Sequence, residues 1–133
     1  MVTQTSLSPA QIVALGFGVV YMLIGLVGFA ATGFDGWIAQ NYTEKLLLFP
    51  INPLHNIVHI ALGVVWMFSA STHAGAKRIN QLLGVVLLAV AALGFLGVLK
   101  FLAIEKATSP DNFLHLVSAL VALYFGTIGA TER

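Results

Sequence analysis

The chain has 133 residues, 59% of them hydrophobic and only 8% charged, and its mean hydropathy is +0.95. Soluble domains carry about 25% charged residues, so the composition indicates a membrane protein and excludes a water-soluble globule with a polar coat. The formal net charge of +1 excludes the basic face that a nucleic-acid partner requires, and the absence of cysteine excludes disulfides, thiolate catalysis and cysteine-ligated metal clusters.

Four apolar segments are long enough to cross a bilayer, because a membrane helix needs about 20 largely apolar residues. The segments are Pro9–Ala31, Pro53–Ser71, Ile79–Leu102 and Pro110–Ala130. We therefore predict an all-α membrane protein with four transmembrane helices, forming a single integral membrane domain over residues 1–133.

Three of the four segments start with the same kind of dipeptide. Ser8-Pro9, Asn52-Pro53 and Ser109-Pro110 each place a capping side chain before a proline at the first helical position. The third segment instead follows a basic turn at residues 76–78. The N-terminal stretch has no Lys or Arg ahead of its first apolar run, so we expect a retained helix and not a secretory signal.

The number of segments sets the topology. An even number places both termini on one side, together with the turn at residues 72–80, which holds Lys77 and Arg78 and no acid. This clustering of basic residues favours cytoplasmic termini. The long loop at residues 32–52 contains Trp37 and Tyr42, which are typical of a segment along the headgroups; a lid over a site is the alternative.

The chain matches itself in two places. Residues 18–29 align without a gap with residues 84–95, and His55–His59 aligns with Asp111–His115. The offsets are 66 and 56 residues, so the first loop carries ten more residues than its counterpart. We predict two tandem, similarly oriented helical hairpins, with repeat 1 at about residues 9–71 and repeat 2 at about residues 79–130.

The second and fourth segments each carry polar residues near their starts. Both helices start on the same side of the membrane, and histidines four residues apart face the same way. If the hairpins are repeats, these polar residues meet in one cluster within one leaflet. The expected cluster comprises His55, Asn56, His59, Asp111, Asn112 and His115.

Several readings of this cluster stay open. Imidazole nitrogens bind zinc, copper, nickel or haem iron, so His55, His59 and His115 are candidate metal ligands, with Asp111 completing the shell. Asn56 and Asn112 would then orient the ring N–H groups. Alternatively, His59 and His115 ligate a haem or chlorophyll-type pigment between the hairpins.

Two further readings need no bound ligand. The same side chains can cap backbone amides and join helices by hydrogen bonds, each worth about 0.6–2 kcal/mol. Proton or small-solute transfer by an oligomer is the other reading. His55 and His59 have the spacing of a zincin motif but lack its Glu, and no nucleophilic triad or phosphate loop is present, so we expect no enzyme.

Two motifs of the chain are similar to those of a known family: the residues from Asn52 to His59 and those from Asp111 to His115. With these motifs the chain resembles the bacterial four-helix membrane proteins catalogued as a domain of unknown function, number 4383, over roughly Ile12 to Ala130. The resemblance implies four spans in a bacterial inner or other energy-transducing membrane and brings no activity. Besides the lipid bilayer, we expect as partner a larger membrane complex, with this chain as accessory subunit, or further copies of the chain.

Overall fold

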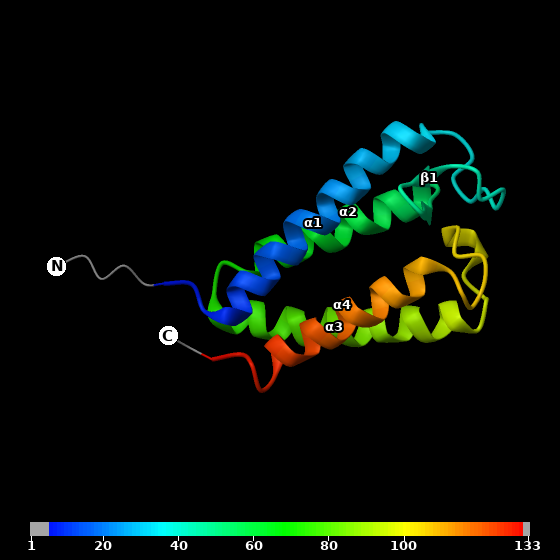
Figure 1. Ribbon diagram of the computed structural model, residues 1–133. Helices are drawn as coiled ribbons and strands as arrows, with labels where there is room; N and C mark the ends of the chain where they lie inside the picture. Colours follow the sequence, from blue (N-terminus) through cyan, green and yellow to red (C-terminus); the bar gives the residue numbers. More distant parts are fainter. Residues whose placement is uncertain (1–5, 132–133) are drawn as a thin grey trace.

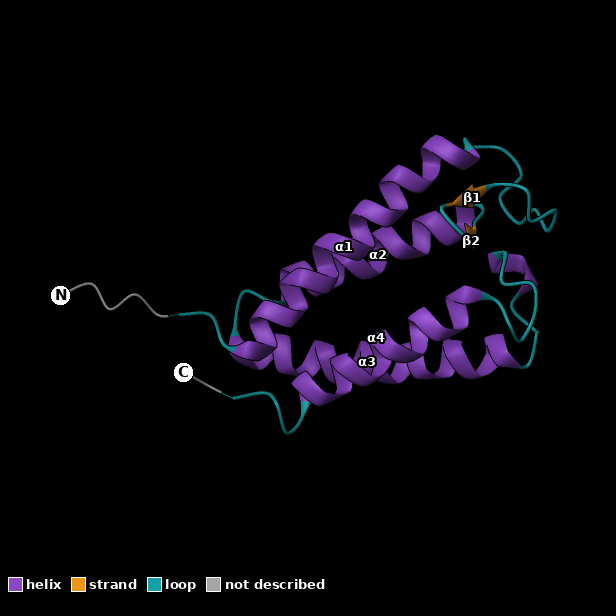
Figure 2. Ribbon diagram, in the orientation of Figure 1, coloured by secondary structure: helices purple, strands orange, loops and turns teal. Residues whose placement is uncertain are grey.

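The computed structural model describes residues 6–131, and this part of the chain is mostly helical (Figures 1 and 2). Four α-helices follow one another along the chain: α1 (Pro9–Thr32), α2 (Pro53–Ser69), α3 (His73–Phe95) and α4 (Pro110–Gly126). Between α1 and α2 lies a small antiparallel hairpin of β1 (Lys45–Leu46) and β2 (Phe49–Pro50), and a short 3-10 helix η1 (Lys100–Leu102) precedes α4. The sequence predicted the four helices and neither of the smaller elements.

Two of the three predicted N-caps are confirmed. The Ser8 Oγ accepts a hydrogen bond from the Gln11 backbone N–H at 3.3 Å, and the Ser8 N–H donates to Gln11 Oε1 at 3.0 Å. Asn52 Oδ1 accepts from the His55 backbone N–H at 2.9 Å. The expected cap at Ser109 is wrong, because its hydroxyl accepts instead from the Lys106 N–H at 3.0 Å, in the loop before α4.

The predicted bounds of the third helix are also wrong. α3 begins at His73, six residues before the expected Ile79, because the Thr72 hydroxyl caps it by accepting from the Gly75 N–H at 3.0 Å. The basic residues at positions 77 and 78 are therefore helical. α3 ends at Phe95 and not at Leu102, and Gly97 follows with a φ of 71°, a left-handed conformation that glycine adopts without strain.

The helices pair as two antiparallel hairpins, α1 with α2 and α3 with α4 (Figure 1). The start of α1, the α2–α3 turn and the end of α4 lie at one end of the molecule, where the hairpins come together. The hairpins diverge toward the other end, which carries the two long loops (Figure 2). The sequence therefore predicted correctly which loops share an end.

Small residues let the helices of each hairpin approach closely, and they do so at equivalent positions. A Cβ at Gly18 would meet Met67, and a Cβ at Gly84 would meet Leu123. Likewise, Gly28 lies against the carboxamide of Asn56 and Gly94 against that of Asn112. In both pairs of contacts, the glycine recurs 66 positions later in the second hairpin, and the residue that it faces recurs 56 positions later. These are the two offsets of the sequence match.

Substitution of one of these glycines should destabilise the fold. In Gly94→Ala the new methyl group would collide with the Asn112 side chain, so we expect a loss of about 1–3 kcal/mol, seen as a lower midpoint of thermal unfolding in detergent. Gly16→Ala is the matched control, because Gly16 lies in α1 with nothing within 4 Å of an added Cβ. It should leave the midpoint unchanged or raise it slightly.

The distribution of polar and apolar side chains is reversed relative to a soluble protein. Large apolar residues are exposed along the outer faces of the helices, among them Val20 and Leu26 in α1, Val85 in α3 and Leu120 in α4. The buried polar or charged residues are Ser8, Asn52, His55, Asn56, His59, Asn80, Ser109, Asp111, Asn112, His115 and Ser118. Two helices, α1 and α3, are long and apolar enough to cross a membrane, whereas α2 and α4 have 17 residues each.

Candidate metal centre

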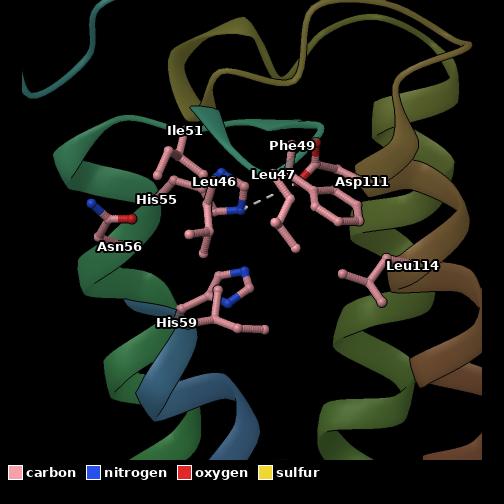
Figure 3. A pocket seen from close by; sticks show the side chains of 10 residues that line it. Leu46, Leu47, Phe49, Ile51, His55, Asn56, His59, Asp111 and Leu114 are labelled. Atoms are coloured by element: carbon pink, nitrogen blue, oxygen red, sulfur yellow. Dashed lines mark ion pairs between the residues drawn. The ribbon is translucent and has the colours of Figure 1, made fainter. Parts of the chain in front are cut away.

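The first turns of α2 and α4 place the predicted histidines in the space between the hairpins. His55 and His59 lie one turn apart on α2, and His115 lies on α4. Their exposed fractions are 3%, 5% and 3%, respectively, so all three side chains are shielded from solvent. Figure 3 shows His55 and His59 extending from α2 toward the side of the space where Asp111 and Leu114 extend from α4.

The two histidine motifs meet, as they should if the two hairpins are repeats. One ring nitrogen from each of His55, His59 and His115 lies within 4.8 Å of the other two. The ring centroids of His55 and His59 are 4.8 Å apart, and each of these rings lies 6.1 Å from the ring of His115. Three imidazoles from two separate hairpins thus converge on one point.

The ring nitrogens of this cluster lack hydrogen-bond partners. The Nδ1 atoms of all three histidines are buried, and none of them has a partner among the described residues. Buried polar atoms in native proteins are nearly always paired, and an unpaired one costs about 1–3 kcal/mol. Three such atoms in one small cluster are therefore available to a partner that is not part of the described chain.

Asp111 lies beside the histidine cluster, nearest to His55. Its Oδ1 is 3.9 Å from His55 Nε2, the ion pair drawn in Figure 3, while its Oδ2 is buried without a partner in the described chain. At this distance the carboxyl group lies beside the His55 ring without a hydrogen bond to it. It is not among the groups whose donor atoms converge with those of His59 and His115.

The amide groups of Asn56 and Asn112 donate hydrogen bonds away from the histidines. The Asn56 carboxamide donates to Thr32 Oγ1 at 2.9 Å, and that of Asn112 donates to the carbonyls of Lys106 and Ala107 at 3.0 and 3.1 Å. Neither amide bonds a histidine ring within the described part of the chain. Both asparagines fasten a helix to the loop or helix end beside it, which is the structural role of the alternative reading.

An aromatic residue that the sequence analysis did not assign to the cluster contacts it. Tyr21 of α1 stacks on the His59 ring, with centroids 4.8 Å apart and an interplanar angle of 15°. Its hydroxyl is also buried without a partner in residues 6–131. A hydroxyl-bearing residue in the middle of a predicted membrane segment was the available signal, since polar atoms within a bilayer need an internal partner.

A cavity of about 90 Å³ adjoins the cluster. The β1–β2 hairpin covers it, because Leu46, Leu47 and Phe49 are part of its lining. Asn52 holds this cover in place by donating to the carbonyls of Ala39 and Phe101, at 3.3 and 2.8 Å. Part of the long first loop therefore covers the cavity.

The donor set fits a transition-metal ion. Imidazole suits zinc, copper, nickel and iron, and metal–nitrogen distances of about 2.0–2.1 Å require ring nitrogens about 3.4 Å apart. The separations of up to 4.8 Å would have to shorten by a little over 1 Å, which side-chain rotation can supply. Pockets for cofactor-sized molecules measure about 300–1,000 Å³, so the cavity of about 90 Å³ favours an ion over a tetrapyrrole.

Comparison with known proteins identifies one relationship. No curated protein matches the chain, and no solved structure matches it either. The family described as "Domain of unknown function (DUF4383)" matches residues 11–128, which include all four helices apart from the first two residues of α1. The chain therefore belongs to this family of unknown function.

Proposed function

We propose that this protein is an integral membrane protein that binds one transition-metal ion between its two hairpins. His55, His59 and His115 are the proposed ligands. The observation that carries the proposal is the convergence of three buried imidazoles whose Nδ1 atoms have no partner in the described chain. Binding, and not catalysis, is the role proposed.

The outward apolar faces support the membrane location. In water, exposed side chains such as Val20, Leu26 and Leu120 would form apolar patches far larger than soluble monomers carry. In a bilayer they face lipid, while the buried polar residues are satisfied or ligated inside. We propose four spans, with α2 and α4 crossing a thinner part of the bilayer, since 17 residues reach about 25 Å.

The equivalent contacts of the hairpins support a tandem duplication. A repeat related by an axis along the membrane normal would place α2 and α4 in the same direction. His59 and His115 then occupy equivalent positions, and His55 corresponds to Asp111. On this proposal the metal site formed at the interface of two copies of an ancestral hairpin.

Metal analysis of the purified protein tests the proposed function. After extraction in mild detergent and exposure to Zn²⁺, Cu⁺ or Ni²⁺, we expect about one tightly held ion per chain, measured by mass spectrometry of the metal. An absorption spectrum distinguishes a tetrapyrrole, which would give an intense band in the visible region. A folded protein that retains neither metal nor pigment would refute the proposal.

Labelling of single cysteines tests the four spans and the cytoplasmic termini. The chain has no native cysteine, so each introduced thiol is unique. With an impermeant maleimide on intact cells, Asp35→Cys should react directly, and Ala74→Cys should react only after the membrane is opened. Leu120→Cys, in the lipid-facing part of α4, should react only after denaturation. Reaction of the first two variants from the same side would contradict the proposed topology.

A second candidate function is that of an accessory subunit in a larger membrane complex. An open groove of about 360 Å³ on the outer face of α1 favours it, because a partner helix could pack there. Its lining residues are Ile12, Val13, Gly16, Phe17, Val20 and Val121. Co-purification of a defined partner in mild detergent, lost in Gly16→Leu, would support this role. The two functions are compatible with each other.

A further inference from the structure

The cavity beside the histidine cluster has an uneven lining. Its polar lining residues are His55, Asn56 and His59 on α2 and Asp111 on α4. The other lining residues are apolar: Ile24, Leu46, Leu47, Phe49, Ile51 and Leu114. A ligand there would touch the histidines on one side and hydrocarbon elsewhere.

The size of the cavity limits what it can hold. Its volume is about 90 Å³, whereas an apolar protein cavity of about 150 Å³ takes up benzene. The space therefore accommodates an uncharged molecule smaller than benzene. An ionic ligand would lose its hydration without gaining enough partners from an apolar lining, while apolar cavities in proteins stay dry and take up uncharged guests such as xenon.

From these features we infer that the cavity is a second binding site, for an uncharged diatomic molecule of the size of dioxygen. Three histidine ligands leave a coordination position of a metal open, and two of the proposed ligands, His55 and His59, line the cavity. Contact between the diatomic molecule and a metal rests on the proposed function. Occupation of the cavity rests on its volume and lining alone.

The β1–β2 hairpin, which covers the cavity, provides a route by which a small ligand can enter. Leu47 lines the cavity and is also 86% exposed at the tip of the β1–β2 hairpin. A single side chain thus separates the cavity from the surroundings at this point. An uncharged diatomic molecule dissolves well in lipid and can enter when Leu47 changes rotamer, which exposed side chains do within nanoseconds.

Xenon, an uncharged atom of similar size, tests the inference on metal-free protein. Methyl groups of Ile51 and Leu114 are observed by NMR in lipid nanodiscs while the xenon pressure is raised. We expect their chemical shifts to saturate, as binding at one site requires. The lipid-facing methyls of Leu120 should shift linearly instead, because xenon only partitions into the lipid around them.

Two α1 variants provide the control. Ile24→Phe fills the cavity and should abolish the saturating shift, whereas Val27→Phe adds the same ring on the exposed face and should leave it unchanged. Linear shifts at Ile51 and Leu114 would overturn the inference, as would long-lived water contacts to these methyls, which would mark a hydrated cavity. Because no metal is present, a negative result is distinguishable from failure of the metal site.

Discussion

Replacement of His59 by alanine should reduce the affinity for metal by at least about 100-fold, because residues that merely orient a ligand already contribute about 10–100-fold. The His59 ring lies 4.8 Å from that of His55 on the same helix and 6.1 Å from that of His115 on the other hairpin. Its loss leaves two imidazoles on different hairpins, which chelate an ion far less well than three. Titration with a competing chelator measures the change.

The fourth histidine of the chain is the matched control for this experiment. His73 begins α3 at the opposite end of the molecule, where its Nδ1 lies 2.8 Å from Ser8 Oγ. His73→Ala should therefore retain full metal affinity. Asp111→Asn should have an intermediate effect, since its carboxylate contacts the His55 ring but does not converge with the three nitrogens. Equal losses in His59→Ala and His73→Ala would show that the effect came from misfolding.

Trp66→Ala should cause the largest loss of stability among the substitutions considered, about 3–5 kcal/mol. Trp66 is fully buried and stacks on Phe17 with ring centroids 5.0 Å apart. Its Nε1 donates to Asn80 Oδ1 at 3.0 Å, and Asn80 in turn donates to the Ala10 carbonyl at 3.0 Å. Removal of the indole opens a cavity and also breaks a link among α1, α2 and α3. Thermal unfolding in detergent measures the loss.

The second tryptophan of the chain distinguishes this effect from a general cost of losing an indole. Trp37 lies in the first loop and is 46% exposed, so Trp37→Ala should change stability by less than about 1 kcal/mol. Trp66→Phe keeps most of the packing but leaves Asn80 Oδ1 unpaired, and it should cost about 1–3 kcal/mol. A Trp66→Ala variant as stable as Trp37→Ala would falsify the assignment of Trp66 to the packed core.

The helices could be predicted from the sequence because local signals mark them: a long apolar segment, and in three of the four a proline at the first helical position. The exceptions arise where a local signal had two readings. Thr72 caps α3, but the basic residues after it suggested a turn. Ser109 precedes a proline as Ser8 does, yet its hydroxyl turns back to Lys106. The β1–β2 hairpin has only two residues in each strand, too few for a detectable alternation.

The candidate site was predictable in part. A shared cluster of His55, His59 and His115 was predicted on the premise that the hairpins are repeats, and the geometry brings the three side chains within reach of one ion. The partners of the side-chain amides could not be predicted, because composition does not reveal that Asn56 packs against Gly28 and Asn112 against Gly94. Tyr21 was not assigned to the cluster because its contact with His59 depends on how α1 is rotated about its axis.

The divergence of the hairpins would give a bound metal ion a mechanical role. Two of the proposed ligands belong to the first hairpin and one to the second, and they lie near the end where the hairpins separate. A bound ion would therefore link the two hairpins, and its binding free energy would add to the free energy of their association. In the metal-free protein the loop end would be the looser one, so metal supply would set how rigidly the halves are joined.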